Sequence, residues 1–190
     1  MPLNKNEQVS IVEYDSRWPV EFSRLARVLK RFLGDSHEKI EHVGSTAVPG
    51  LAAKPILDID IVIAGEDKLP VVRDKLAQLE YSFEGEKGIS QRWAFRRKDE
   101  KTPNDGSKKT WMDHHLYVCP RESRELKRHL FLREFLRNHP QKVQEYGELK
   151  KDFSRKFGFD RIGYTEAKTV FLEGILEKGA PDYDLQKALQ

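Results

Sequence analysis

Residues 42–62 read HVGSTAVPGLAAKPILDIDIV, a Gly-Ser turn followed by a strand that carries two aspartates. From residue 56 to residue 63 the chain is aliphatic enough for a strand buried on both faces, and only Asp58 and Asp60 interrupt it. Because side chains alternate along a strand, both carboxylates point the same way. An unpaired buried carboxylate is destabilising by on the order of several kcal/mol, so the pair needs a cation, a partner or a cleft. A divalent metal ion supplies the first two, and the arrangement suggests metal-nucleotide chemistry.

The length and composition of the chain favour one domain in a reducing compartment. Its 190 residues can bury a full core, and Lys plus Arg nearly balance Asp plus Glu (34 against 31). The overall charge therefore does not indicate a nucleic-acid or membrane partner, although a local basic face remains compatible with one. Cys119 is the sole cysteine, which excludes an internal disulfide and a zinc site built from cysteines, and it fits the cytoplasm. No segment has the pattern of a signal peptide or a membrane span.

Hydrophobic periodicity predicts a sheet part followed by a helical part. We expect a single domain over residues 1–190, with the sheet core at about 10–120 and the helices at about 121–178. Pro19 suits the first turn of the first helix, Ser123 caps the third, and the tail after Gly179 is expected to fray. The predicted helices are 18–33, 68–79, 123–138, 141–157 and 166–178, the strands are 39–43, 56–63, 81–84, 91–97 and 112–118, and 98–110 is an exposed hairpin loop.

Several stretches carry a resemblance to a known family: VEYDSRWPVEF near the start, HVGSTAVPGL, KPILDIDIVI, HHLYV, and HLFLREFLRNHP followed by EYGELK. Through them the chain resembles the GrpB family, a branch of the nucleotidyltransferase superfamily, over roughly residues 10–178. The resemblance implies an α/β (α+β) fold with a nucleotidyltransferase-like mixed sheet, flanking helices and a helical C-terminal part. In that fold a Gly-Ser pair and an Asp-x-Asp strand hold a nucleotide and its metal. Some relatives resemble fusions to dephospho-coenzyme A kinase, which hints at coenzyme A or nucleotide metabolism.

The Gly-Ser turn has the chemistry of a phosphate-binding loop. Gly44 lets the backbone approach a phosphate, and the hydroxyls of Ser45 and Thr46 can donate to its oxygens. Alone, such a triplet is more often an ordinary turn with side-chain hydrogen bonds. The aspartate strand that follows at this spacing favours the functional interpretation.

Asp58 and Asp60 are the predicted ligands of one or two Mg²⁺ (or Mn²⁺) ions that also hold the triphosphate oxygens of a nucleotide. Such metals neutralise charge on the transferred phosphoryl group and orient an attacking hydroxyl. The alternatives are an edge strand whose carboxylates face water, or ion pairs with nearby Lys and Arg residues. The aliphatic residues on both sides of the pair favour the metal interpretation.

A third acid or base is expected from the strand WMDHHLYV. Alternation puts Asp113, His115 and Tyr117 on one face, and with Leu116 and Val118 facing the core, His115 is the candidate for the cleft. It would act as general base or ligand, although histidine prefers softer metals than Mg²⁺. The alternative is a hydrogen-bonded structural histidine. Tyr117 stands where the family commonly has a second histidine.

A bound triphosphate is an anion and requires basic residues around it. Lys54 follows the turn and Arg92 lies on a strand expected beside the site, while His129, Arg133 and Arg137 recur every four residues on one predicted helix. Such a spacing is more often a solvated face. Arg133 and Lys54 rank first among these candidates, and Lys150 and Lys168 are weaker ones.

Three hypotheses follow. The first is a metal-dependent nucleotidyltransferase that moves a nucleoside monophosphate from a nucleoside triphosphate to an unidentified hydroxyl acceptor. The second is a non-catalytic nucleotide-binding or regulatory module on the same fold. The third is a protein or RNA interaction domain that docks through its helical half, and salt-sensitive RNA binding that ignores Asp58 and Asp60 would favour it.

Overall fold

A computed structural model describes residues 10–157 and 160–179, and its centre is a five-stranded mixed sheet. The strand order is β1-β2-β5-β4-β3; β2 and β5 run parallel, and the other neighbours are antiparallel. The predicted fold class, a mixed sheet with flanking helices and a helical C-terminal part, is confirmed. The strands are β1 (Lys39–Val43), β2 (Leu57–Ile63), β3 (Tyr81–Gly85), β4 (Trp93–Arg97) and β5 (His114–Pro120).

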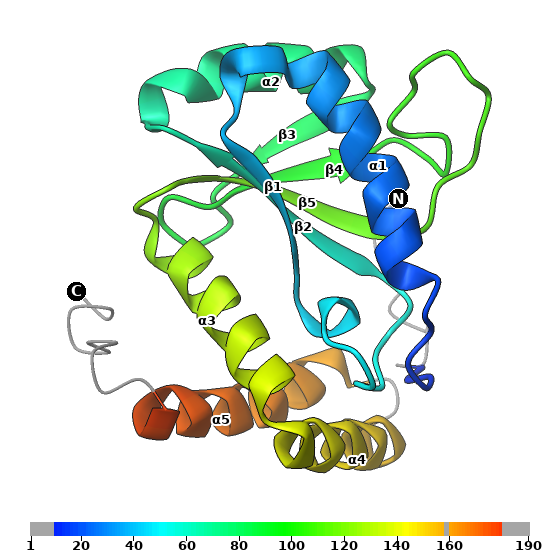
Figure 1. Ribbon diagram of the computed structural model, residues 1–190, viewed down its shortest axis with the longest axis vertical. Coiled ribbons are helices and arrows are strands. Elements are labelled where there is room, and N and C mark those ends of the chain that lie inside the picture. Colours follow the sequence, from blue (N-terminus) through cyan, green and yellow to red (C-terminus); the bar gives the residue numbers. More distant parts are fainter. Residues whose placement is uncertain (1–9, 158–159, 180–190) are drawn as a thin grey trace.

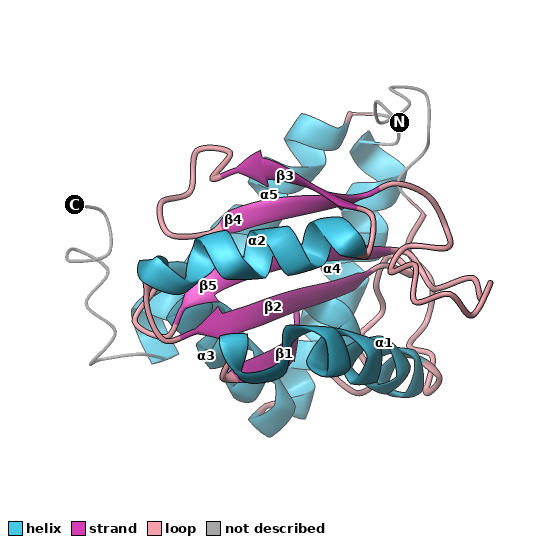
Figure 2. Cartoon of the chain, turned by 90° about the horizontal axis from the view of Figure 1, so that it is seen from above, coloured by secondary structure: helices cyan, strands magenta, loops and turns pink. Residues whose placement is uncertain are grey.

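Helices cover both faces of this sheet. Figures 1 and 2 show α1 (Trp18–Leu33) and α2 (Leu69–Gln78) on one face, with α3 (Arg124–Asn138) crossing the other. The last two helices, α4 (Pro140–Phe157) and α5 (Arg161–Gly179), lie beyond α3 at the end of the sheet (Figure 1). None of the helices in the described part of the chain combines the length and apolarity needed to cross a bilayer.

The first helix follows the prediction at both ends. Pro19 occupies its first turn, where a missing N–H costs nothing, and Gly34 ends it at φ 53°, a left-handed value that favours glycine. Its buried stripe includes Leu25, Leu29 and Leu33, none of which is exposed. Each such leucine stabilises the fold by roughly 1.5–3 kcal/mol, so the stripe fixes α1 on the sheet.

The alternation of β2 separates an apolar face from a polar one. Ile59 and Ile61 are fully buried in the core formed with α1 and α2, whereas Asp58 and Asp60 point to the face that α3 crosses. The parallel register of β2 and β5 sets Asp58 beside His115 and Asp60 beside Tyr117. The sheet thus gathers four polar side chains on one face.

Several features differ from the prediction. The last strand spans His114–Pro120, two residues later than predicted at both ends, and Asp113, just before it, pairs with Arg97 at 2.5 Å. The loop at 98–110 is only partly exposed, since Thr102 and Pro103 are buried and the Pro103 carbonyl accepts a hydrogen bond from Trp111 Nε1 at 3.0 Å. The final helix begins at Arg161, five residues earlier than expected. The tail after Gly179 lies outside the described residues.

Candidate functional site

A cavity of about 580 Å³ lies between the polar face of the sheet, the loop after β1 and the three C-terminal helices. Its volume is in the range of small-molecule sites. Residues from both halves of the chain line it, including Gly44, Ser45, Lys54, Asp58, Arg92, His115, Tyr117, Glu125, His129, Arg133, Lys150 and Lys168. Most of the predicted site residues are therefore brought together.

The Gly-Ser turn packs directly on the first aspartate. Gly44 has φ 70°, and a Cβ at this position would lie 3.0 Å from both Cβ and Cγ of Asp58 and would overlap its carboxylate. Only glycine satisfies both the backbone angle and the space. The turn continues as a short 3₁₀ segment, Ser45–Ala47, that presents Ser45 to the cavity.

Asp58 is the carboxylate that faces the cavity. Its side chain is 34% exposed, and its Oδ1 accepts a hydrogen bond from His115 Nδ1 at 2.9 Å. Burial opposes its ionisation, but the hydrogen bond and charge of His115, together with the charge of Lys168, outweigh burial and lower the pKa of Asp58. Asp58 is therefore an anion at neutral pH. Because Nδ1 is engaged by Asp58, Nε2 is the ring nitrogen of His115 that remains for another partner.

Asp60 is buried behind the residues that line the cavity, and a histidine from α3 binds its carboxylate. It is 0% exposed, and its Oδ2 accepts from His129 Nδ1 at 2.7 Å, while His129 Nε2 donates to Glu125 Oε1 at 3.1 Å. Burial works against a cationic His129, yet the two carboxylates prevail and raise its pKa to about 9. Asp60 Oδ1 is buried and has no hydrogen-bond partner among the described residues.

Tyr117 and Arg92 close the side of the cavity next to Asp60. The Arg92 guanidinium lies 4.4 Å from the centre of the Tyr117 ring and 3.6 Å from Glu125. Burial and, next, the charge of Asp58 raise the pKa of Tyr117 to about 12, so its hydroxyl is neutral. A neutral phenol thus stands beside Asp60, where a third carboxylate would complete a two-metal site.

The helical wall brings two lysines to the turn. Lys150 of α4 is 1% exposed, and its Nζ donates to Ser45 Oγ at 3.0 Å. Lys168 of α5 lines the same cavity. Sequence reasoning ranked both below Arg133 and Lys54, because a lysine on an amphipathic helix carries no local sign that it points inward.

The other predicted phosphate ligands are engaged elsewhere to different degrees. Thr46 lies beneath the turn: it donates to the Ile56 carbonyl at 3.4 Å and accepts from His42 Nε2 at 3.0 Å, so its hydroxyl is not in the cavity wall. Burial lowers the pKa of His42 to about 4, which keeps that ring neutral. Arg133 lines the cavity but binds Glu41 Oε2 at 2.7 Å and the His42 carbonyl at 2.8 Å.

The sequence does not reveal the partner of the second aspartate or the residue behind that partner. His129, predicted to face a triphosphate, instead bonds to Asp60, and Glu125, which no motif singles out, binds the other nitrogen of His129. The four-residue spacing of His129, Arg133 and Arg137 is not an exposed basic stripe, because Arg137 also turns inward and donates to the Ala47 carbonyl. The four-residue spacing instead marks the face of α3 that packs on the turn and the sheet.

The two aspartates fit a hard divalent cation. Mg²⁺ is commonly held by one or two carboxylates and completes its coordination with substrate phosphates and water. Asp58 offers a carboxylate to the cavity, and Asp60 Oδ1 is a buried acceptor that no described group satisfies. The described residues form no cluster of three or more His, Cys, Asp or Glu side chains suited to a metal. A metal here would therefore depend on oxygen ligands from its substrate.

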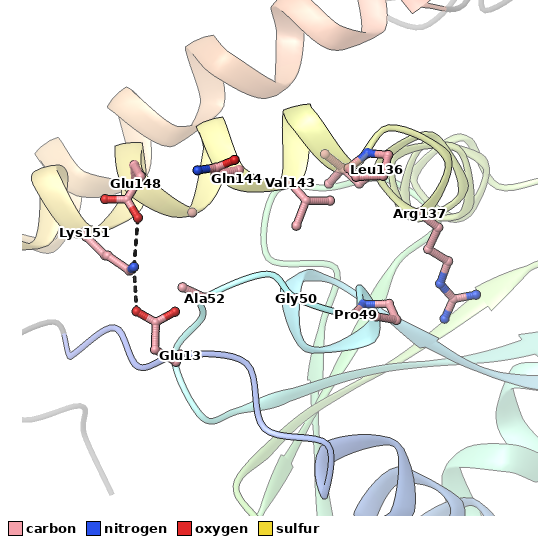
Figure 3. A pocket seen from close by; sticks show the side chains of 12 residues that line it. Glu13, Pro49, Gly50, Ala52, Leu136, Arg137, Val143, Gln144, Glu148 and Lys151 are labelled. Atoms are coloured by element: carbon pink, nitrogen blue, oxygen red, sulfur yellow. Dashed lines mark hydrogen bonds and ion pairs between the residues drawn. The ribbon is translucent and has the colours of Figure 1, made fainter.

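A second cavity, of about 630 Å³, lies between the loop after the turn and α4 (Figure 3). Its wall includes Pro49, Gly50, Ala52, Val143 and Gly147. At one end Lys151 bridges Glu13 and Glu148 at 2.6 and 2.9 Å, and the stem of Arg137 lies at the other end (Figure 3). These charges are already paired, so this cavity presents mainly apolar surface to a ligand.

Fold and site together define an α/β protein with a five-stranded mixed sheet, helices on both faces and a polar cavity between the sheet and the C-terminal helices. The family model described as "GrpB protein" matches residues 8–178, and the chain belongs to the GrpB family. UPF0157 protein PA4798 of Pseudomonas aeruginosa is 36% identical over 172 residues, which are 90% of this chain and 67% of the relative.

A solved structure of the same family shares the fold. The crystal structure of the conserved protein GrpB from Enterococcus faecalis has a TM-score of 0.68 and 29% identity, covering 87% of this chain and 98% of that one. A structure of the Cid1 poly(U) polymerase bound to MgATP gives a TM-score of 0.47 and 9% identity, over 74% of this chain and 45% of that one. A likeness as weak as the second carries no inference about function.

Proposed function

We propose that this protein is a cytoplasmic, Mg²⁺- or Mn²⁺-dependent nucleotidyltransferase that moves a nucleoside monophosphate from a nucleoside triphosphate to a hydroxyl acceptor. The observation that carries the proposal is the close packing of the Gly44–Ser45 turn on Asp58 at the wall of a cavity. The turn suits a phosphate, and the carboxylate suits the metal that accompanies it.

The charges around the cavity support an anionic ligand. Basic side chains in its wall outnumber acidic ones: Lys54, Arg92, Arg128, His129, Arg133 and Lys168 stand against Asp58 and Glu125, and the amine of Lys150 lies among them. Glu125 is also close to three of these cations, His129, Arg128 and Arg92, which leaves a basic excess toward the turn and α4. A site lined mainly by one sign of charge concentrates ligands of the other sign.

Asp58, Asp60 and His115 have different roles in the proposed transfer. In the proposed reaction the acceptor oxygen bonds to the α-phosphorus, the bond to the bridging oxygen of the β-phosphate breaks, and pyrophosphate leaves. Asp58 and Asp60 would hold the metal, which supplies charge neutralisation when it is bound. Asp58 also fixes the ring of His115 through Nδ1–H, so Nε2 is placed to take the proton of the acceptor hydroxyl.

A thermal-shift screen tests the binding part of this proposal. The four ribonucleoside triphosphates are added with Mg²⁺ or Mn²⁺ to the native protein, to Asp58→Asn and to Asp113→Asn. A ligand that binds only the folded state raises its melting temperature. We expect a metal-dependent shift that Asp58→Asn abolishes and that Asp113→Asn keeps, because Asp113 pairs with Arg97 outside the cavity. No shift with any triphosphate would contradict the proposal.

One observation favours the non-catalytic alternative. Tyr117 occupies the register position beside Asp60, and a neutral phenol cannot act as the third carboxylate of a two-metal site. A regulatory nucleotide-binding module would bind the triphosphate in the same cavity and leave it intact. Release of pyrophosphate in the presence of pooled small-molecule alcohols and RNA separates the two: binding without release at any acceptor supports the module.

A further inference from the structure

Lys150 is a deeply buried amine without an acidic partner. It is 1% exposed, its Nζ bonds to the neutral Ser45 hydroxyl, and it lies 4.5 Å from the centre of the Tyr146 ring. Among the described residues this Nζ forms no ion pair, and Asp58 acts on it through charge without a hydrogen bond. Burying a charged ammonium without a counter-ion is costly. The side chain is therefore either neutral or completed by an anion from outside the chain.

Three other basic side chains of the cavity differ from Lys150 because they have acidic partners. Arg133 is paired with Glu41, Arg92 with Glu125, and His129 with Asp60 and Glu125. Lys168 resembles Lys150: it lines the cavity and has no ion pair among the described residues. The two lysines, from α4 and α5, thus line the same cavity without an ion pair among the described residues.

The charged groups that face Lys150 are Lys168 on α5 and Asp58 on β2. Burial and the charge of Lys168 together lower the pKa of Lys150 to about 6, and Asp58 only partly opposes them. Burial also lowers the pKa of Lys168. Lys150 is consequently a neutral amine above pH 6 in the free protein, and an anion placed beside it would restore the ammonium form.

We propose that Ser45, Lys150 and Lys168 form a subsite for a phosphate group, and that the phosphate binds together with a proton that Lys150 takes up. The identification of this group as the terminal phosphate of a nucleotide rests on the proposed function; the anion subsite itself does not.

The chemistry of the three groups matches a tetrahedral oxyanion. Ser45 Oγ accepts from Lys150, so its own O–H remains to donate to a ligand oxygen. A protonated Lys150 has two further N–H bonds, and Lys168 approaches from another helix. A phosphate has several acceptor oxygens that point in different directions, whereas a carboxylate has two in one plane. Donors from the turn, α4 and α5 therefore suit a phosphate.

Calorimetry in two buffers of different ionisation enthalpy measures the proton directly. The probe is methyl phosphate without metal at pH 8, where a phosphate monoester, with a second pKa near ~6, brings no proton of its own. We expect uptake of nearly one proton per phosphate, and an affinity that weakens about tenfold between pH 7 and pH 8. Lys150→Met, which keeps the apolar stem, is expected to bind at least about tenfold more weakly and without proton uptake.

Controls make each outcome informative. Lys127→Met removes an exposed lysine that pairs with Glu122 away from the cavity, and it should behave as the native protein. If Lys150→Met does not fold, Lys150→Arg provides a permanent charge and should bind without proton uptake. Native protein that binds phosphate without taking up a proton, or Lys150→Met with native affinity, would overturn the proposal.

A nucleotide arm separates this proposal from the proposed function. Metal-dependent triphosphate binding without proton uptake at pH 8 would leave the function standing and remove the Lys150 subsite. Proton-linked binding of methyl phosphate, with no binding of any triphosphate, would support the Lys150 subsite and contradict the proposed function.

Discussion

Replacing His129 by glutamine should destabilise the protein in a pH-dependent way. His129 lies between Asp60 Oδ2 and Glu125 Oε1, at 2.7 and 3.1 Å, and its pKa is raised from 6.5 to about 9. That rise corresponds to about 3 kcal/mol of folding stability. Because the folded state binds the proton more tightly, this stability is complete below pH 6.5 and disappears as the pH rises through 9. The free energy of unfolding of the variant should therefore be about 3 kcal/mol lower than that of the native protein at pH 6, and the two should become similar above pH 9.

Urea denaturation followed by circular dichroism at pH 6 and pH 9.5 measures this difference. His139→Gln is the matched control, because His139 is exposed and its Nδ1 contacts the Phe135 carbonyl rather than a carboxylate. Adding Asp60→Asn to His129→Gln should recover part of the loss, since it removes the buried carboxylate left without a partner. An equal loss of stability at both pH values, or none at pH 6, would refute the reasoning.

Three further predictions concern the turn, the buried lysine and a helix cap. Gly44→Ala should abolish the nucleotide-dependent thermal shift and lower stability by at least about 1 kcal/mol, because its Cβ would overlap Asp58 at a left-handed φ. Lys150→Met should remove a pH dependence of stability that is opposite in sign to that of His129. Between pH 6 and 10.5 the unfolded native chain binds more protons than the folded one, so Lys150 makes native stability rise by about 1.4 kcal/mol per pH unit. Urea titrations at pH 6.5 and 9 would detect the loss of this pH dependence in the variant. Ser123→Ala should cost about 1 kcal/mol in the same assay, since its hydroxyl accepts from Leu126 N at the start of α3.

The elements that build the sheet were predictable because their signals are local. The apolar stripe of α1 and the period of two in β2 each lie within one segment, and both appear where the sequence places them. Alternation also predicted that Asp58 and Asp60 share one face and that His115 shares the face of Tyr117. Each of these inferences needs only the geometry of a single strand or helix.

The partners of the site were not predictable in the same way. His129 reaches Asp60 across 69 positions, and Lys150 reaches Ser45 across 105. No periodicity links such residues, and a four-residue basic spacing describes an exposed face as well as an inward one. Arg133 and Arg137 illustrate the ambiguity, since both bind backbone carbonyls near the turn rather than solvent. The roles of these side chains depend on how the helices dock.

The long separations in this site also bear on how the chain folds as it is synthesised. The strand with Asp58 and Asp60 leaves the ribosome well before His129, and Lys150 and Lys168 follow later still. Until α3 docks, the two carboxylates face water on one side of a newly formed sheet. Charges on an otherwise aliphatic strand discourage pairing with other chains. The aspartates that pair with cationic side chains in the folded protein thus protect the nascent sheet from aggregation before those side chains have been synthesised.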